Sequence, residues 1–284
     1  MFQKAEKKKS KLRLAIDGPS GSGKTFGSLI VAKSIAESIG LRTAVIDTEH
    51  GSASLYSDKF DFDVMEIKGN FAPEEYIKGI KAAESAGYGV LIIDSLSHEW
   101  DGVGGCLDIN TKLGGRYTDW GKVTPRHDAL IQAILGSPLH IIATMRTKTE
   151  YVIEKNDKGK DAPRKVGTAP KQRDGLEYEF SAVFNLNQQH MASVSKDRTS
   201  LFDGRDFMLD DSVGKQLMDW LDNGKDAEAE KQIIADFEIV INDCSTVDEL
   251  KGAWSKIPAQ YHEQLIRAKV IKYRALTPPQ TQAA

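Results

Sequence analysis

The chain has 284 residues, of which 40% are hydrophobic and 28% are charged, and its formal net charge is -3. This length can bury one large domain, or one domain with a small appendage, and the near-neutral charge excludes a uniformly basic nucleic-acid coat protein. Its two cysteines are too far apart to suggest a disulfide framework or metal-ligand spacing, and no apolar run approaches the roughly 18 residues that cross a bilayer, so we expect a cytoplasmic protein with no membrane partner.

The first half of the sequence alternates strand and helix patterns. Short apolar strand patterns occupy residues 12–17, 43–47, 90–94 and 139–145. Helical patterns lie between them at residues 24–39, at residues 73–87 and from residue 124, where Thr124 and Pro125 have the N-cap and N1 chemistry of a helix start. This alternation predicts an α/β fold with a mainly parallel sheet flanked by helices on both faces.

After residue 145 the pattern changes to antiparallel strands and then helices. Residues 150–154 and 164–166 flank a charged hairpin tip, and two more strand patterns at residues 180–186 and 190–195 surround a polar turn. A short helical pattern at residues 213–221 precedes a candidate linker. We therefore expect a basic N-terminal tail at residues 1–10, a core domain at residues 11–222, a small helical domain at residues 226–276 and a flexible tail at residues 277–284.

A glycine-rich turn joins the first strand pattern to the first helix. It matches the P-loop pattern G-x-x-x-x-G-K-[ST] at every defined position, with the residues Gly18, Pro19, Ser20, Gly21, Ser22, Gly23, Lys24 and Thr25. In that pattern the backbone N–H groups surround phosphates, the lysine reaches the outer phosphates, the hydroxyl holds Mg²⁺ and the helix N-terminus adds its dipole. Since a strand precedes the turn and a helix follows it, we predict binding and hydrolysis of a nucleoside triphosphate with Mg²⁺.

Acidic residues follow two other strand patterns. Asp94 ends an apolar strand, where a carboxylate can lie beside the P-loop and hold Mg²⁺ through water, and we favour that role over an ordinary turn aspartate. Glu49 follows residues 43–47 at the sheet edge where open α/β folds bind ligands. It could activate water as a general base, but spacing alone does not distinguish that role from an ordinary polar loop.

Three segments carry a resemblance to a known family. Residues 44–50 (AVIDTEH) resemble the strand and catalytic glutamate of RecA-type recombinases. Through IDTEHGSA (46–53), IDSLSHEW (93–100) and QRDGLEYEF (172–180), the chain resembles more closely the short phage-encoded RecA/Rad51-like ATPases of single-strand annealing and recombination. The resemblance covers residues 10–220 and implies a RecA-like P-loop NTPase core followed by a small C-terminal helical region.

The resemblance also implies roles for single residues. Lys24 and Thr25 would contact the phosphates and Mg²⁺ of ATP, Glu49 would be the water-activating base and Asp94 the second magnesium acid. Thr144 lies where RecA proteins place a glutamine that senses the γ-phosphate, so the chain departs from the family there.

Lys196 and Arg198 resemble a K-x-R element that related oligomeric ATPases insert into the site of a neighbouring protomer. Positive charge supplied in this way would make hydrolysis depend on assembly. The alternative is a pair of solvated surface cations.

The segment at residues 144–173 holds nine Lys or Arg against four Asp or Glu and occupies the position of a RecA-type DNA-binding loop. Basic side chains there would bind a phosphate backbone without sequence preference, and a tyrosine can stack on a base. Without the resemblance, the same pattern is more typical of a solvated face. The candidate DNA contacts are Lys148, Tyr151, Lys155, Lys158, Lys160, Arg164 and Lys165. We also expect residues 97–120 to be a flexible, glycine-containing region near the second DNA loop of RecA proteins.

These expectations combine into an ATPase that forms a ring or filament on single-stranded DNA and promotes strand annealing or exchange in phage-type recombination, in the host cytoplasm if phage-encoded. A single-strand-binding protein is a further expected partner. One rival is a DNA motor, such as a ring helicase or packaging ATPase, which would translocate directionally. Another is a nucleotide-switched regulator that binds proteins and is not stimulated by DNA. The chain shows no lid or acceptor motif of a small-molecule kinase.

Overall fold

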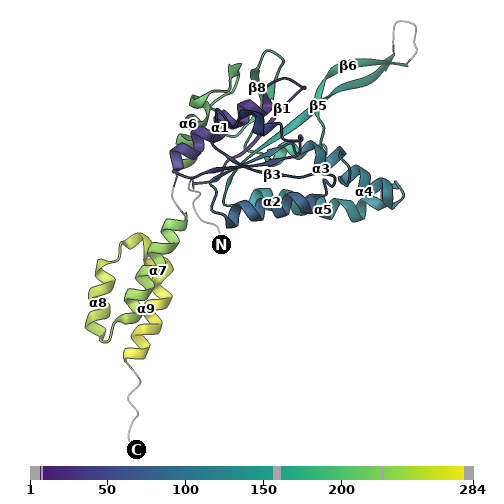
Figure 1. Cartoon of the computed structure of the whole chain (residues 1–284). Coiled ribbons are helices and arrows are strands. Elements are labelled where there is room, and N and C mark those ends of the chain that lie inside the picture. The colour runs from purple at the N-terminus through teal and green to yellow at the C-terminus, as the bar shows by residue number, and fades with distance from the viewer. Residues whose placement is uncertain (1–6, 8, 156–160, 225–226, 278–284) are drawn as a thin grey trace, which may run out of the picture. The chain divides into compact units, whose positions relative to one another are not determined.

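The computed structural model describes residue 7 and residues 9–155, 161–224 and 227–277, with the backbone alone at residues 149–155, 161–167 and 227–228 (Figure 1). The chain divides into two compact units. The first is Ser10–Leu221, and the second contains the chain from Asp222 onward.

A mixed sheet forms the centre of the first unit. Its strand order is β3-β2-β4-β5-β1-β7-β8-β9, with β6 paired to β5 outside that path. Neighbours from β3 to β7 along this order run parallel, whereas β6, β8 and β9 are antiparallel to their partners. The strands are β1 (Arg13–Gly18), β2 (Thr43–Asp47), β3 (Asp63–Glu66), β4 (Val90–Asp94), β5 (His140–Lys155), β6 (Asp161–Pro170), β7 (Ala182–Leu186), β8 (Met191–Asp197) and β9 (Phe207–Met208).

Helices cover both faces of this sheet (Figure 1). Alternate residues of β4 divide between two buried clusters, because successive side chains of a strand point to opposite faces. Val90 and Ile92 pack in the cluster that includes side chains of α1 (Lys24–Ile39) and α6 (Asp211–Asp222). Leu91 and Ile93 pack in the cluster that includes side chains of α2 (Pro73–Ser85) and α5 (Trp120–Gly136). The predicted fold class, a mainly parallel sheet flanked by helices, is therefore confirmed.

The prediction of a flexible region at residues 97–120 was wrong. This segment folds into α3 (Ser97–Asp101), α4 (Cys106–Leu113) and the 3-10 turn η2 (Tyr117–Asp119). Gly104 and Gly114 have positive φ angles of 76° and 126°, so these glycines allow tight connections between the short helices.

The predicted start of the next helix was also wrong. α5 begins at Trp120, and Pro125 lies inside it. The Trp120 ring stacks on that of Trp100, with centroids 5.4 Å apart, and the Asp119 carboxylate accepts a hydrogen bond from the N–H of Arg116 at 2.9 Å. These contacts start the helix upstream of the position that proline chemistry favours.

The predicted hairpin after residue 145 is present. β5 continues from the sheet, and from Thr147 it pairs antiparallel with β6. Figure 1 shows the two strands leaving the sheet as a ribbon. β7 and β8 form the second predicted antiparallel pair.

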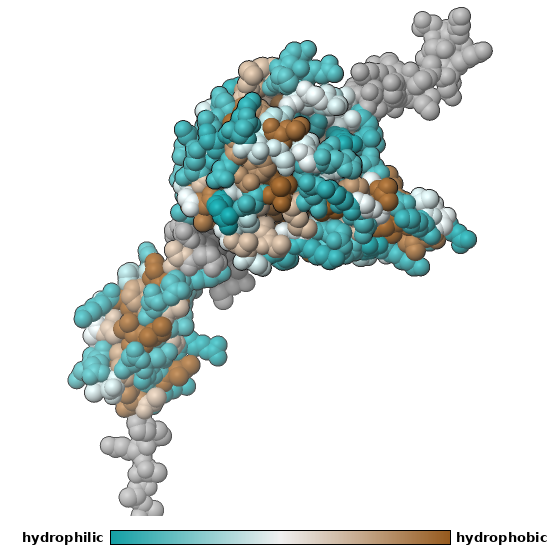
Figure 2. All heavy atoms as spheres, viewed as in Figure 1, coloured by the Kyte–Doolittle hydropathy of each residue, from teal (hydrophilic) through white to brown (hydrophobic). Residues whose placement is uncertain are grey.

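The second unit consists of α7 (Ala227–Asp243), α8 (Val247–Lys256) and α9 (His262–Leu276). Its own apolar cluster includes Ile241, Leu250 and Leu265. Figure 2 shows further apolar side chains on its surface, and the exposed ones include Ile239, Val240, Ile266, Val270 and Ile271. Short 3-10 turns complete the two units: η1 (Ala53–Tyr56), η3 (Leu176–Glu179) and η4 (Ala259–Tyr261). Among the residues that the structure describes, no helix is both long and apolar enough to cross a membrane.

Candidate nucleotide site

The glycine-rich turn runs from the end of β1 to the start of α1. Gly21 and Gly23 have φ angles of 77° and 87°, a left-handed conformation that glycine adopts at little cost. A side chain at Gly18 would lie 2.7 Å from the carbonyl oxygen of Leu186, so the loop passes too close to β7 for any other residue. The sequence therefore produces a tight loop that leads into a helix N-terminus, which is the geometry of an anion site.

Lys24 reaches back across this loop. Its Nζ donates hydrogen bonds to the carbonyl oxygens of Gly18 at 3.0 Å and Pro19 at 2.9 Å. Burial lowers the pKa of Lys24, although the nearby carboxylates of Asp94 and Glu49 act in the opposite direction. The lysine ammonium thus lies at the centre of the loop, close to the two acids.

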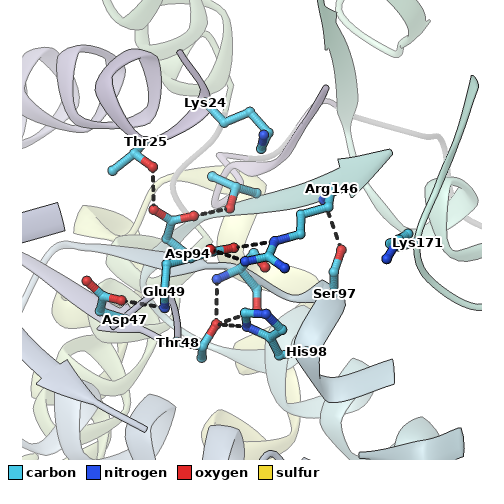
Figure 3. Close-up of polar contacts among 12 residues, drawn as sticks. Lys24, Thr25, Asp47, Thr48, Glu49, Asp94, Ser97, His98, Arg146 and Lys171 are labelled. Atoms are coloured by element: carbon cyan, nitrogen blue, oxygen red, sulfur yellow. Dashed lines mark hydrogen bonds and ion pairs between the residues drawn. The ribbon is translucent and has the colours of Figure 1, made fainter. Parts of the chain in front are cut away.

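A buried carboxylate links the loop to the neighbouring strands (Figure 3). Asp94 Oδ2 accepts a hydrogen bond from Thr25 Oγ1 at 2.6 Å, and Asp94 Oδ1 accepts one from Thr144 Oγ1 at 2.5 Å. Burial raises the pKa of Asp94, and the two hydroxyl groups oppose this effect. Mg²⁺ prefers oxygen ligands and is commonly held by one or two carboxylates together with substrate phosphates. The Thr25 hydroxyl and the Asp94 carboxylate supply such oxygens, so the residues present fit this ion.

Glu49 is held by the turn that follows β2. Asp47 accepts hydrogen bonds from the backbone N–H groups of Glu49 at 2.6 Å and Ala53 at 3.0 Å. Asp47 and Asp94 are register partners in the parallel pair of β2 and β4, so both strands end at the same edge of the sheet. The structure therefore brings Glu49 to the edge that holds Asp94 and the P-loop.

An ion pair with Arg146 engages Glu49 (Figure 3). Arg146 Nε donates to Glu49 Oε1 at 2.7 Å, and Arg146 Nη2 donates to Glu49 Oε2. Burial opposes ionisation of Glu49, but the hydrogen bonds and charge of Arg146 outweigh it and hold the pKa of this carboxyl below its usual value. The same pair raises the pKa of Arg146.

The role of Arg146 was missed in the sequence. It is the last residue of β5 in register with β1, opposite Gly18, and the ribbon with β6 begins at the next residue. Its N–H donates to Ser97 Oγ of α3 at 2.9 Å, and its carbonyl accepts from the N–H of Lys171 at 2.7 Å. The rule that ligands bind beyond the carboxyl ends of parallel strands could have identified it, because β5 leaves the sheet here.

His98 supports the same loop. Its Nδ1 and the Thr48 hydroxyl are hydrogen-bonded at 2.7 Å, and the Thr48 hydroxyl also accepts from the N–H of Ser95 at 2.8 Å. Burial lowers the pKa of His98, and the charge of Arg146 acts in the same direction. His98 therefore links α3 to the residue before Glu49, and its ring also packs 5.0 Å from that of Phe71.

A cavity of about 390 Å³ lies beside the P-loop. Its walls combine the loop backbone with large side chains, which include Phe26, Tyr56, His190 and Met208. The rings of Phe26 and Tyr56 meet edge to face, with centroids 5.4 Å apart. An apolar, partly aromatic cavity next to a phosphate loop suits a planar heterocycle.

Lys196 and Arg198 bond to carbonyl groups of the 172–180 segment. Lys196 Nζ donates to the carbonyl oxygen of Glu177 at 3.1 Å, and Arg198 Nη2 donates to that of Tyr178 at 3.0 Å. The structure therefore brings them together with this segment, and their action in a neighbouring protomer stays a prediction.

The candidate DNA contacts lie on or beside the β5-β6 ribbon. Lys148 is exposed on β5. The backbone is described, but the side chains are not, for Tyr151, Lys155, Arg164 and Lys165. Lys158 and Lys160 lie outside the described residues. DNA binding by this set stays a prediction.

Comparisons with known proteins found one family match and a similar solved structure. A family model described as AAA domain matches residues 10–232. No curated protein matches the chain. Among solved structures, the chain is similar to a KaiC-like protein from the hyperthermophilic archaeon Pyrococcus horikoshii, with a TM-score of 0.43 and 15% identity, over 71% of this chain and 93% of that chain.

Proposed function

We propose that this chain, which belongs to the AAA domain family, is a P-loop ATPase of the RecA-like kind and that single-stranded DNA stimulates its hydrolysis of ATP. We further propose that it assembles on that DNA as a ring or filament and promotes annealing or exchange of strands. The ion pair between Glu49 and Arg146 carries this proposal, because it connects the acid beside the P-loop to the base of the basic ribbon.

The triphosphate would lie in the P-loop, with Lys24 on its outer phosphates and the base in the cavity beside Phe26 and Tyr56. Thr25 and Asp94 would hold Mg²⁺. When bound, this ion would neutralise charge that develops during phosphoryl transfer.

Glu49 would orient the attacking water and accept its proton. A positioned general base accelerates a reaction by about 10²- to 10⁴-fold when it can take up a proton. While the Arg146 guanidinium holds both carboxylate oxygens, the pKa of Glu49 is lowered and the group is a weak base. Efficient hydrolysis would therefore require Arg146 to move away.

In this proposal Arg146 would respond to DNA through the ribbon. Its carbonyl accepts from Lys171, which follows β6, so its backbone is tied to both strands of the ribbon. Residues 144–173 include nine basic and four acidic residues, and a segment of this composition attracts a phosphate backbone. DNA bound there would draw the ribbon and Arg146 away from Glu49, which then becomes available as a base.

Assembly would add a second condition for turnover. In a ring or filament, Lys196 and Arg198 of one protomer would stabilise charge in the site of the next. By its resemblance to the phage recombination ATPases, the chain would act together with a single-strand-binding protein.

The test is steady-state ATP hydrolysis with and without oligo(dT), at low and moderate salt, for wild type, Arg146→Ala and Arg126→Ala. Arg126 makes a similar two-bond ion pair with Glu74, at 2.6 and 2.8 Å, and is the matched control. We expect DNA to stimulate wild type at low salt and less at moderate salt. Arg146→Ala should raise the rate without DNA about tenfold or more and reduce the further effect of DNA, whereas Arg126→Ala should behave as wild type.

Hydrolysis of wild type that is indifferent to DNA would remove the recombination role and favour a nucleotide-switched regulator. Directional translocation would favour a DNA motor. A lower rate of Arg146→Ala both with and without DNA would show that Arg146 assists hydrolysis and does not restrain it.

A further inference from the structure

A groove of about 900 Å³ lies between α3, the start of α5 and the base of the β5-β6 ribbon. Its lining includes Trp100, Tyr117 and Trp120, together with Lys148 and Arg173. Three aromatic rings and two cations thus gather in one open groove that the nucleotide site does not use.

Two of the aromatic rings in this groove are stacked and the third is exposed. The indoles of Trp100 and Trp120 are stacked, with centroids 5.4 Å apart and planes inclined by 19°, and both residues are half-buried. Tyr117, on η2 just before Trp120, is 92% exposed. A tyrosine this exposed makes little contribution to the folded core, whereas a ligand could cover its ring.

The cations lie where the ribbon meets the groove. Lys148 is exposed, and Arg173 pairs with the exposed Asp128 at 3.0 Å. Lys171, beside them, pairs with Asp101 at 3.1 Å. Exposed ion pairs of this kind contribute little stability, so phosphate groups can replace the aspartates at small cost.

A buried network fixes the inner wall. The Glu99 carboxylate is fully buried and is hydrogen-bonded to His127 Nδ1 at 3.0 Å and to Gln172 Nε2 at 3.1 Å. The ring of His127 meets that of Trp100 edge on, 5.6 Å away. Because these groups satisfy one another, Trp100 and the turn that carries Arg173 are held in place before any ligand binds.

We infer that this groove binds single-stranded nucleic acid, with bases stacked on Tyr117 and on the Trp100–Trp120 pair and with phosphates on Lys148 and Arg173. The inference rests on the proposed function, since it adds a defined binding site for its DNA. Aromatic platforms beside cations are the usual chemistry of sequence-tolerant single-strand binding. The segment at residues 144–173, which includes Lys148 and Arg173, holds nine Lys or Arg against four Asp or Glu, and this excess favours a polyanion over a peptide.

The position of the groove also connects it to the nucleotide site. Lys148 is two residues beyond Arg146 on β5, and Trp100 is on α3, whose Ser97 accepts a hydrogen bond from the Arg146 N–H. Nucleic acid in the groove would therefore contact both segments that hold Arg146.

The first experiment measures the affinity of the full chain for fluorescein-labelled oligo(dT) by anisotropy. The variants are Tyr117→Ala and, as a control, Tyr273→Ala, a partly exposed tyrosine of the second unit. Loss of one stacked base should weaken binding of Tyr117→Ala by about fivefold or more, whereas the control should bind as wild type.

A second experiment does not depend on the folding of a groove variant. In the double variant Trp220→Phe and Trp254→Phe, Trp100 and Trp120 are the remaining tryptophans of the chain. Their fluorescence should be quenched as oligo(dT) is added, at the concentrations that give the anisotropy change.

If wild type binds oligo(dT) but Tyr117→Ala binds equally well and no quenching occurs, the groove is not the site, and the proposed function still stands. If wild type does not bind oligo(dT), both the groove and the proposed DNA role fail.

Discussion

Residues 94–100 take part in both of the sites described above, which are built from different interactions. At the start of the segment, Asp94 lies among the hydroxyl groups of Thr25 and Thr144, where short hydrogen bonds join the end of β4 to the start of α1 and to β5. At its end, Trp100 stacks on Trp120 between two helices. The nucleotide site depends on the sheet, and the groove depends on ring packing. The two should therefore respond separately to substitution, with Arg146 as the connection between them.

The largest effect is expected from Arg198→Ala, which should separate turnover from DNA affinity. If Arg198 acts in the site of a neighbour, hydrolysis should fall about 10³-fold or more, because an arginine supplied to phosphoryl transfer contributes that much. Nucleotide and oligo(dT) binding should be retained. Steady-state hydrolysis and a fluorescent-nucleotide titration check this, with the exposed Arg205→Ala as the control. Normal turnover by Arg198→Ala would remove this residue from the mechanism.

The second prediction concerns the pH dependence of stability near the P-loop. Asp17 is buried at the end of β1, and burial raises its pKa from 3.8 to about 6, although the Asn185 amide donates to both carboxylate oxygens and Lys24 lies near. A pKa raised by folding means that the native state favours the protonated form. Ionisation of Asp17 therefore lowers the free energy of unfolding as pH rises from about 4 to 6. At neutral pH the total loss is about 3 kcal/mol.

Asp17→Asn removes this titration. The free energy of unfolding of the variant, relative to wild type, should increase by up to about 3 kcal/mol between pH 4 and pH 7. Urea denaturation at several pH values measures the difference, with the exposed Asp203→Asn as the control. A difference that does not change with pH would show that Asp17 titrates near its usual value.

The smallest effect is expected from the ribbon. Neutralising Lys158, Lys160, Arg164 and Lys165 together should weaken oligo(dT) binding about tenfold at low salt and flatten its salt dependence, because each phosphate contact contributes roughly 0.7 to the slope for single strands. Hydrolysis without DNA should not change. Anisotropy titrations from low to moderate salt test this, and an unchanged slope would place the contacts elsewhere, with the groove as the first alternative.

The nucleotide site could be predicted from the sequence because its residues follow the ends of strands. The P-loop, Glu49 and Asp94 each follow an apolar strand, and parallel strands end at one edge, so short sequence patterns were sufficient to bring them together. Their catalytic roles stay predictions. Arg146 was missed because its partner Glu49 is 97 residues away and the sheet register brings the two together.

The groove could not be anticipated in this way. Glycines around residues 102–115 suggested a flexible loop, but the stacked rings of Trp100 and Trp120 and the buried Glu99 stabilise helices there. These contacts join segments that are about 20 residues apart or more in the sequence. Local helix propensity depends on neighbouring residues only, so it does not predict such contacts.

β5 also has a consequence for local unfolding. From Ile141 to Ala143 the strand lies between β1 and β4, its pairing with β1 continues to Arg146, and from Thr147 it belongs to a two-stranded ribbon. A ribbon of two strands is marginally stable, whereas opening the sheet requires unfolding of the core. Amide hydrogen exchange should therefore be slow before Arg146 and fast beyond it. Within this one strand, residues before Arg146 would exchange only through global unfolding, and residues a few positions later would exchange through local unfolding.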